Sequence, residues 1–297
     1  MEKAEAAAEK VLEINPVYVD AMINLAGLKV DLGFHDQGIE LFRRALVEDA
    51  TNTFAWAGLM FGMLFSSQIQ VADILSVAAE GDERVWRPLW RGDSFVDRNR
   101  DAERQLRVGW VSSDLRSHAV GAFVGPFVSS LSDGRFQHYV YDNWPTGDSV
   151  TAAIKPFARE WRGIRGLSDN AVADLICSDE IDILMDLNGF TAGHRLGVFA
   201  RKPAPIQVEW LGFPGTTGMS AMDYILVPND DFLAKGDWCS EKPWLLKDCY
   251  GVRSGIPNVP VRESLPCDDN GHFTFACMNR FSKVRETLHK PPSCIAV

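Results

Sequence analysis

Three polar segments, two of which contain glycine, carry most of the side chains that could do chemistry. They are SSDLRSH at 112–118, NGFTAGH at 188–194 and GFPGTTG at 212–218. The third combines three glycines, which let a ligand approach the backbone closely, with two threonine hydroxyls. This pattern is typical of a cradle for a sugar or a phosphate, although an ordinary turn between a strand and a helix has the same composition.

Two of these segments also contain candidate ligand-binding side chains. His118 ends the first segment beside Arg116 and Ser117, and a loop imidazole can act as a base or hold an anion. The alternative is a surface histidine without a role. Asn188, Gly189 and Thr191 could offer an amide, a close backbone approach and a hydroxyl to a polar ligand, or form a simple Asn-Gly turn.

The cysteines and histidines predict no metal site. Cys267, His272 and Cys277 have no fourth ligand near them, and their spacing differs from that of zinc motifs. The six cysteines are scattered without a Cys-x-x-Cys pair, which indicates a reducing compartment. No Walker loop, GxSxG motif or HExxH motif occurs in the sequence.

From residue 106 onward, apolar strand-like runs alternate with helical stretches. We expect strands at 106–111, 136–142, 181–187, 205–211 and 222–227, and helices at 119–131 and from an N-cap at Ser168 to about Cys177. This alternation predicts βαβ units and a parallel, Rossmann-like sheet. Each of the three polar segments follows a predicted strand. They are therefore expected at one edge of the sheet, where α/β proteins bind ligands.

The first part of the chain contains a helical repeat. Asp49-Ala50 stands 34 residues after Asn15-Pro16, and the small and apolar residues between them fit a tetratricopeptide (TPR) helix-turn-helix with Gly33 at the turn. Those residues are Leu25, Ala26, Gly38, Phe42 and Ala45, while Ala4, Ala8 and Val11 fit a preceding helix and Trp56, Leu59 and Met60 a following one. An ordinary helical hairpin is the alternative. Residues 81–105 are expected to connect the repeats to the sheet, with Trp86 and Trp90 packed inward.

Composition and charge exclude several classes of protein. The 297 residues include 46% apolar residues, which is typical of a globular chain. Forty acidic against thirty basic side chains leave no large basic face, so we expect no nucleic-acid partner. The longest apolar stretch, 54–65, is too short for a bilayer, and the N-terminus has no apolar leader segment. We expect no membrane association and a cytoplasmic location.

Three longer stretches together resemble a known family. RVGWVSSDLRSHAVG (107–121), residues 186–228 and FACMNRFSKV (275–284) are similar to the catalytic region of protein O-GlcNAc transferases, and most of all to the bacterial TPR-containing homologues grouped with Spindly. The resemblance implies a GT-B fold of two Rossmann-like lobes. It also implies inverting transfer of N-acetylglucosamine from UDP-GlcNAc, or another nucleotide sugar, to Ser or Thr hydroxyls of proteins. It implies no required metal or cofactor, and an acceptor protein or peptide that contacts the TPR helices.

The resemblance also assigns site residues. His118 falls on the histidine beside the sugar, and Lys283 falls on the lysine at the donor diphosphate, where an ammonium would offset the charge of the leaving UDP. Arg280 stands at a nucleotide-contacting position where a Gln is usual. The residues on the sugar side are Asn188, Gly189, Thr191, Gly212, Phe213, Pro214, Gly215 and Thr216. Phe190 and Phe213 replace a common Tyr, and Asp182 replaces a His of the animal enzymes.

The sequence thus predicts four parts. TPR-like helices occupy 1–80, a connector 81–105, an N-terminal Rossmann-like catalytic lobe 106–264, and the start of a truncated second lobe 265–297. We expect Pro291-Pro292 to end any helix there, and a strand at 273–278 to lack partners. Because most nucleotide contacts of the family lie in the second lobe, activity of this chain alone is doubtful. A non-catalytic TPR interaction module and a truncated gene relic are the alternatives.

Overall fold

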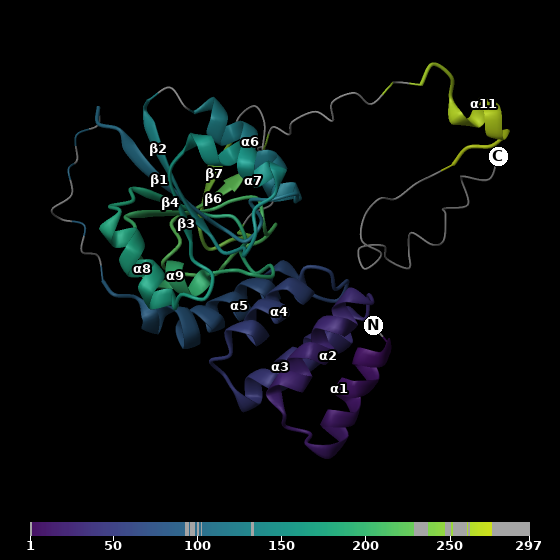
Figure 1. The fold of residues 1–297 in the computed structure, drawn as a ribbon. Coiled ribbons are helices and arrows are strands. Elements are labelled where there is room, and N and C mark those ends of the chain that lie inside the picture. The colour runs from purple at the N-terminus through teal and green to yellow at the C-terminus, as the bar shows by residue number, and fades with distance from the viewer. Residues whose placement is uncertain are drawn as a thin grey trace.

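The structure is a computed structural model that describes residues 2–92, 95, 99, 101, 103–131, 134–228, 237–246, 251, 260 and 262–274. It has two layers of different kinds (Figure 1). An array of helices from the first part of the chain lies beneath a parallel sheet that has helices on its faces. No helix of the described residues is both long and apolar enough to cross a bilayer.

Five helices form the array. They are α1 (Glu2–Ile14), α2 (Val19–Asp31), α3 (His35–Glu48), α4 (Thr53–Met63) and α5 (Val71–Gly81). Gly33 has a φ of +89° in the turn between α2 and α3, a left-handed conformation that favours the predicted glycine. A Cβ at Gly38 would lie 2.8 Å from the carbonyl oxygen of Ala26, so α2 and α3 approach each other closely at this residue. The predicted helix-turn-helix is confirmed as a pair of packed helices.

Helix α1 is less buried than the repeat pattern predicts. Ala8 is buried against α2, whereas Ala4 and Val11 are exposed. The physical reason is that α1 packs mainly on α2, which covers only one side of it.

The predicted connector begins as a helix. After α5 the chain continues through a π-helical turn, η1 (Asp82–Trp86), and a 3-10 turn, η2 (Arg87–Leu89). Trp86 is buried as predicted, but Trp90 is only partly buried. Asp82 is also buried, and its carboxylate accepts the backbone N–H of Ser220 at 3.0 Å and the guanidinium of Arg87. The helical array is therefore hydrogen-bonded directly to a loop of the sheet.

The sheet contains seven strands in the order β3-β2-β1-β4-β5-β6-β7, and every neighbouring pair is parallel. The order reverses between β1 and β4, which lie side by side. The five predicted strands and their parallel pairing are confirmed, and β3 and β7 are additional. The bounds are β1 (Leu106–Ser112), β2 (Phe136–Asp142), β3 (Ala158–Gly163), β4 (Ile183–Asp186), β5 (Ile206–Glu209), β6 (Tyr224–Val227) and β7 (Lys242–Leu245).

Short helices connect the strands. The predicted helices are present as α6 (Ala119–Ser130) and α8 (Asp169–Ser178), and the Oγ of Ser168 accepts the N–H of Ala171 as the expected N-cap. Among the described residues, the sequence did not predict α7 (Ser149–Ile154), η3 (Lys155–Phe157) and α9 (Leu196–Ala200), nor α11 (Pro266–Asn270), which lies after β7 and connects no strands.

Two apolar cores cover the two faces of the sheet. On one face, Trp110 and Trp210 pack with Val124 of α6, and the two indole centroids lie 6.3 Å apart. On the other face, the core is continuous from the sheet into the helical array. Its buried members include Tyr141, Leu184, Phe190, Phe213 and Met219 on the sheet side, and Trp56, Met60, Met63, Val77, Ala78 and Trp86 on the array side.

Candidate functional site

The first two polar segments meet at the carboxyl edge of the sheet, as predicted, because β1 and β4 are parallel neighbours. The backbone N–H of Ser113 donates to Oδ1 of Asn188 at 3.0 Å. The side-chain amide of Asn188 donates in return to Oγ of Ser113 at 2.9 Å and to Oδ2 of Asp114 at 3.0 Å. Asn188 is only 1% exposed. It therefore holds the two loops together, and its amide groups already have partners within the protein.

The third segment, after β5, packs against the second through its glycines. A Cβ at Gly212 would lie 2.0 Å from the carbonyl oxygen of Leu187, and a Cβ at Gly189 would lie 2.3 Å from the Cβ of Phe213. Gly189 has a φ of +53°. The rings of Phe190 and Phe213 meet edge to face with centroids 5.3 Å apart. The glycines thus allow two loops to lie in backbone contact.

The threonines of GFPGTTG face the protein interior. Thr216 is buried and its hydroxyl donates to Oε2 of Glu241 at 2.6 Å. Thr217 is buried too, and both its N–H, at 2.7 Å, and its hydroxyl donate to Oε1 of Glu241. The expectation that these hydroxyls face a ligand is therefore wrong, because both of them donate hydrogen bonds to Glu241. Pro214 is exposed in this segment, whereas Phe213 is buried.

His118 lies at the same edge and is accessible. It precedes α6, and its Nδ1 accepts the N–H of Val120 at 3.3 Å. The same Nδ1 lies 3.8 Å from Oδ2 of Asp114, and the His118 side chain is 41% exposed. A neutral imidazole that accepts at Nδ1 carries its proton on Nε2. This tautomer is suited to donating a hydrogen bond to an oxygen of a ligand.

Thr191 completes the accessible group. It is partly exposed, and its hydroxyl donates to the carbonyl oxygen of Asn188 at 2.8 Å. The hydroxyl oxygen accepts from Nδ2 of Asn188 at 3.3 Å, and its second lone pair can accept one more hydrogen bond. The predicted site residues therefore divide into two sets. His118, Thr191 and Pro214 are at least partly exposed, while Asn188, Phe213 and Thr216 are buried and support them.

Two buried acids that the sequence patterns did not indicate lie beneath this edge. Asp186 and Glu209 are both 0% exposed, and they are paired in register at the ends of β4 and β5. Burial raises the pKa of Asp186, and burial followed by the charge of Asp186 raises the pKa of Glu209 well above its usual range. Oδ1 of Asp186 accepts the N–H of Asn188 at 3.0 Å. In the sequence, each acid stands out as a carboxylic acid side chain within a largely apolar predicted strand.

Helix α4 of the array touches both the second and the third loop. At its start, the ring of Phe54 lies 6.5 Å from that of His194 between centroids. Just after its end, Leu64 is within contact distance of the position that a Cβ on Gly215 would take. Burial lowers the pKa of His194 to about 4, so this ring is neutral near pH 7. The array therefore borders the candidate site directly.

The rest of the predicted site is not covered by the structure. Arg280, Lys283 and Cys277 lie outside the described residues, as does most of the strand expected at 273–278. Within the described part, no group of three or more His, Cys, Asp or Glu side chains is placed to hold a metal ion. The arrangement that can be described is a rim that offers an imidazole, a hydroxyl and glycine backbone to a polar ligand.

Comparisons with known proteins give consistent matches. The family model of glycosyl transferase family 41 matches residues 91–244. A Petunia hybrida protein named probable UDP-N-acetylglucosamine–peptide N-acetylglucosaminyltransferase SPINDLY is 29% identical over 209 residues, which are 67% of this chain and 22% of that protein. The Arabidopsis thaliana protein named as the same type of transferase, SEC, is 33% identical over 196 residues, 61% of this chain and 20% of that protein.

A solved structure agrees with these matches. A mutant of the O-GlcNAc transferase of Thermobaculum terrenum superposes with a TM-score of 0.80 and 29% identity, and the match covers 86% of this chain and 49% of that one. A match over 86% of the chain includes residues of both the helical array and the sheet. The matched part spans about a fifth of the length of the curated relatives.

Proposed function

The chain belongs to glycosyl transferase family 41, and from this premise we propose that it forms the N-terminal, acceptor-side lobe of a GT-B protein O-GlcNAc transferase. The reaction would be inverting transfer of N-acetylglucosamine from UDP-GlcNAc to a Ser or Thr hydroxyl. The observation that carries the proposal is the meeting of the loops after β1, β4 and β5 at one edge of the sheet, inside the residues that match the family.

In the proposed reaction the acceptor hydroxyl attacks the anomeric carbon and releases its proton to solvent, the bond to the UDP oxygen breaks, and UDP leaves with the bonding electron pair. His118 and Thr191 would hold oxygens of the sugar or the acceptor, because both are accessible hydrogen-bonding groups. Asn188 and Asp114 would orient His118. Lys283 remains the predicted partner of the diphosphate. The expectation of no metal and no cofactor also remains a prediction.

The helical array would contribute to acceptor binding. Helix α4 of the TPR-like array borders the loops that carry Thr191 and Gly215. A polypeptide that follows the array would therefore arrive at the candidate sugar site. The names of the Petunia and Arabidopsis relatives, which specify a peptide acceptor and a UDP-GlcNAc donor, support this assignment. A cytoplasmic location remains a prediction from the sequence.

Glycosyl transfer by the purified 297-residue chain tests the proposal. UDP-GlcNAc and a Ser/Thr peptide library are incubated with the chain, and modified peptides are measured by mass spectrometry. His118→Ala is expected to lower transfer about 100-fold, the usual effect of losing a catalytic acid, base or hydrogen-bonding group. Ser117→Ala, a change at the exposed neighbour, serves as the matched control and is expected to leave transfer unchanged.

Two results would contradict the proposal. The first is transfer that is equal in the His118→Ala variant and in the unsubstituted chain. The second is transfer that falls equally in the His118→Ala and Ser117→Ala variants, because the effect would then not be specific to His118.

A further inference from the structure

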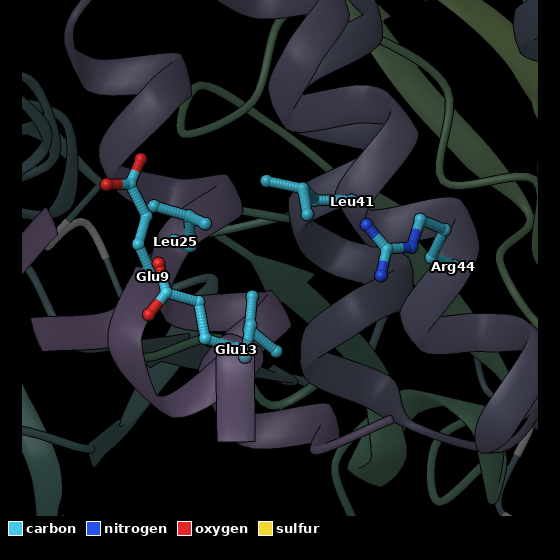
Figure 2. A pocket seen from close by; sticks show the side chains of 6 residues that line it. Glu9, Glu13, Leu25, Leu41 and Arg44 are labelled. Carbon is cyan, nitrogen blue, oxygen red and sulfur yellow. The ribbon is translucent and has the colours of Figure 1, made fainter. Parts of the chain in front are cut away.

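The helical array contains a groove that the candidate site does not use (Figure 2). It lies between α1 and α3, over α2, and has a cavity volume of about 420 Å³. Its floor is apolar and its rim is charged. The lining residues are Leu12, Leu25 and Leu41 on the floor, Glu9 and Glu13 on the α1 side, and Arg44 on the α3 side.

The α1 rim carries uncompensated negative charge. Glu5, Glu9 and Glu13 are spaced four residues apart, so their side chains lie on one side of α1 and repel one another. Lys29 of α2 lies 2.5 Å from Glu5 and 3.5 Å from Glu9. Within the described residues, Glu13 has no basic partner. The negative charge that remains is therefore concentrated at the end of α1 that lines the groove.

Arg44 of α3 forms the opposite rim of the groove. Its guanidinium donates to the carbonyl oxygen of Pro16 at 3.4 Å, and in Figure 2 the side chain extends towards the side on which Glu9 and Glu13 lie. Two carboxylates against one guanidinium leave the lining net negative. The surroundings share this sign, because residues 1–50 contain ten acidic and five basic side chains.

We propose that this groove docks a short amphipathic helix of a partner protein, with a basic residue beside its apolar anchors. The anchors would be two aliphatic side chains three or four residues apart, which lie on one face of a helix and suit a volume of this size. Three different helices supply the leucine floor, so a helix laid along the groove meets all three. Its basic side chain pairs with Glu9 and Glu13. The proposal does not depend on the transferase activity.

A synthetic peptide provides the test. The probe is a fluorescein-labelled, alanine-based helix with leucines three and four residues apart and flanking lysines, and its binding to the full 297-residue chain is followed by fluorescence anisotropy. A peptide of the same composition with the leucines spread around the helix is the reference. The probe is expected to bind at least tenfold more tightly than the reference, and more weakly as salt is added.

Variants locate the binding. Glu9→Gln/Glu13→Gln is expected to weaken probe binding about fivefold, because two exposed charge interactions are lost. Glu80→Gln/Glu83→Gln removes the same charge from exposed positions on α5 and η1 and is expected to leave the affinity unchanged. Leu41→Asp places a carboxylate in the floor and is expected to abolish binding. If Leu41→Asp fails to fold, the two double variants alone decide the result.

Three outcomes would overturn the proposal. One is equal affinity for the probe and the reference peptide. Another is probe binding that falls equally in the two double-glutamine variants, which would mean a general charge effect. The third is a concentration-dependent dimer that is lost in Glu9→Gln/Glu13→Gln, because the occupant would then be a second copy of the chain.

Discussion

Replacing Gly212 with alanine should strongly destabilise the protein at the candidate site. The added Cβ would lie 2.0 Å from the carbonyl oxygen of Leu187 and 2.8 Å from Cα of Asn188. Ordinary contacts of a Cβ begin at 3.4 Å, so the two loops would have to separate by more than 1 Å. Both obstacles are backbone atoms, which no rotamer change can remove.

The expected loss is large because the backbone must move. Inserting a methyl group into a packed interior costs about 1–3 kcal/mol, and this position should fall at the upper end. Moving Asn188 would also strain its hydrogen bonds to Ser113 and Asp114. Gly27→Ala is the matched control. Gly27 lies within α2 with nothing within 4 Å of its Cβ position, so the same methyl group should stabilise the helix by up to about 1 kcal/mol.

Urea denaturation of the two variants and the unsubstituted chain, followed by tryptophan fluorescence and circular dichroism, measures both effects. The chain contains nine tryptophans, so the signal is strong. A Gly212→Ala variant within about 0.5 kcal/mol of the unsubstituted chain would contradict the expected loss of stability, since substitutions at the surface alone have effects of that size. Equal changes in stability for Gly27→Ala and Gly212→Ala would contradict it too.

Three further changes test other parts of the structure. The folded state raises the pKa of Glu209, so it binds more protons than the unfolded chain above about pH 4.5, and the free energy of unfolding should fall as pH rises. Glu209→Gln should reduce this fall and leave the part that comes from the raised pKa of Asp186, and an equal change in the free energy of unfolding between pH 5 and pH 8 for both chains would contradict this. Asp82→Ala leaves the N–H of Ser220 without its acceptor and should lower the free energy of unfolding by about 1–3 kcal/mol. Proteolysis between the array and the sheet should become faster, and an unchanged cleavage rate would count against this contact. The guanidinium of Arg104 donates to both carboxylate oxygens of the largely buried Asp182, at 2.7 and 2.5 Å. Arg104→Ala should therefore lower the free energy of unfolding by about 1–3 kcal/mol, and Arg104→Lys should recover only part of this loss in the same denaturation assay.

The sequence predicted the strands that are buried on both faces, and missed the strands at the sheet edges. β1, β2, β4, β5 and β6 are central, and their apolar runs are distinctive. β3 is AREWRG, whose charged side chains are tolerated because one of its edges is open. β7 is KPWL and contains a proline, which has no N–H to donate to a neighbouring strand. Proline is therefore tolerated in an edge strand, but in a sequence it indicates that a segment is not a strand.

The place of the candidate site was predictable, but the direction of its side chains was not. Parallel pairing alone brings the three loops to one edge. The hydroxyls of Thr216 and Thr217 turn inward because Glu241, which directly precedes the unpredicted β7, accepts them. Glu209 falls within the apolar strand predicted at 205–211, and its pairing with Asp186 of a different strand is found only through the register of the sheet.

The shared core between the array and the sheet has a consequence for synthesis of the chain. Asp82 and Ser220 are 138 residues apart, and a ribosome adding about 5–20 residues per second needs roughly 7–28 s to make the intervening segment. During this interval α4 and α5 have emerged, whereas Phe213 and Met219, which cover their apolar side, have not yet been made. The nascent repeats therefore leave Met63 and Ala78 uncovered until the loop after β5 has been made, and this exposed apolar surface is of the kind that chaperones bind.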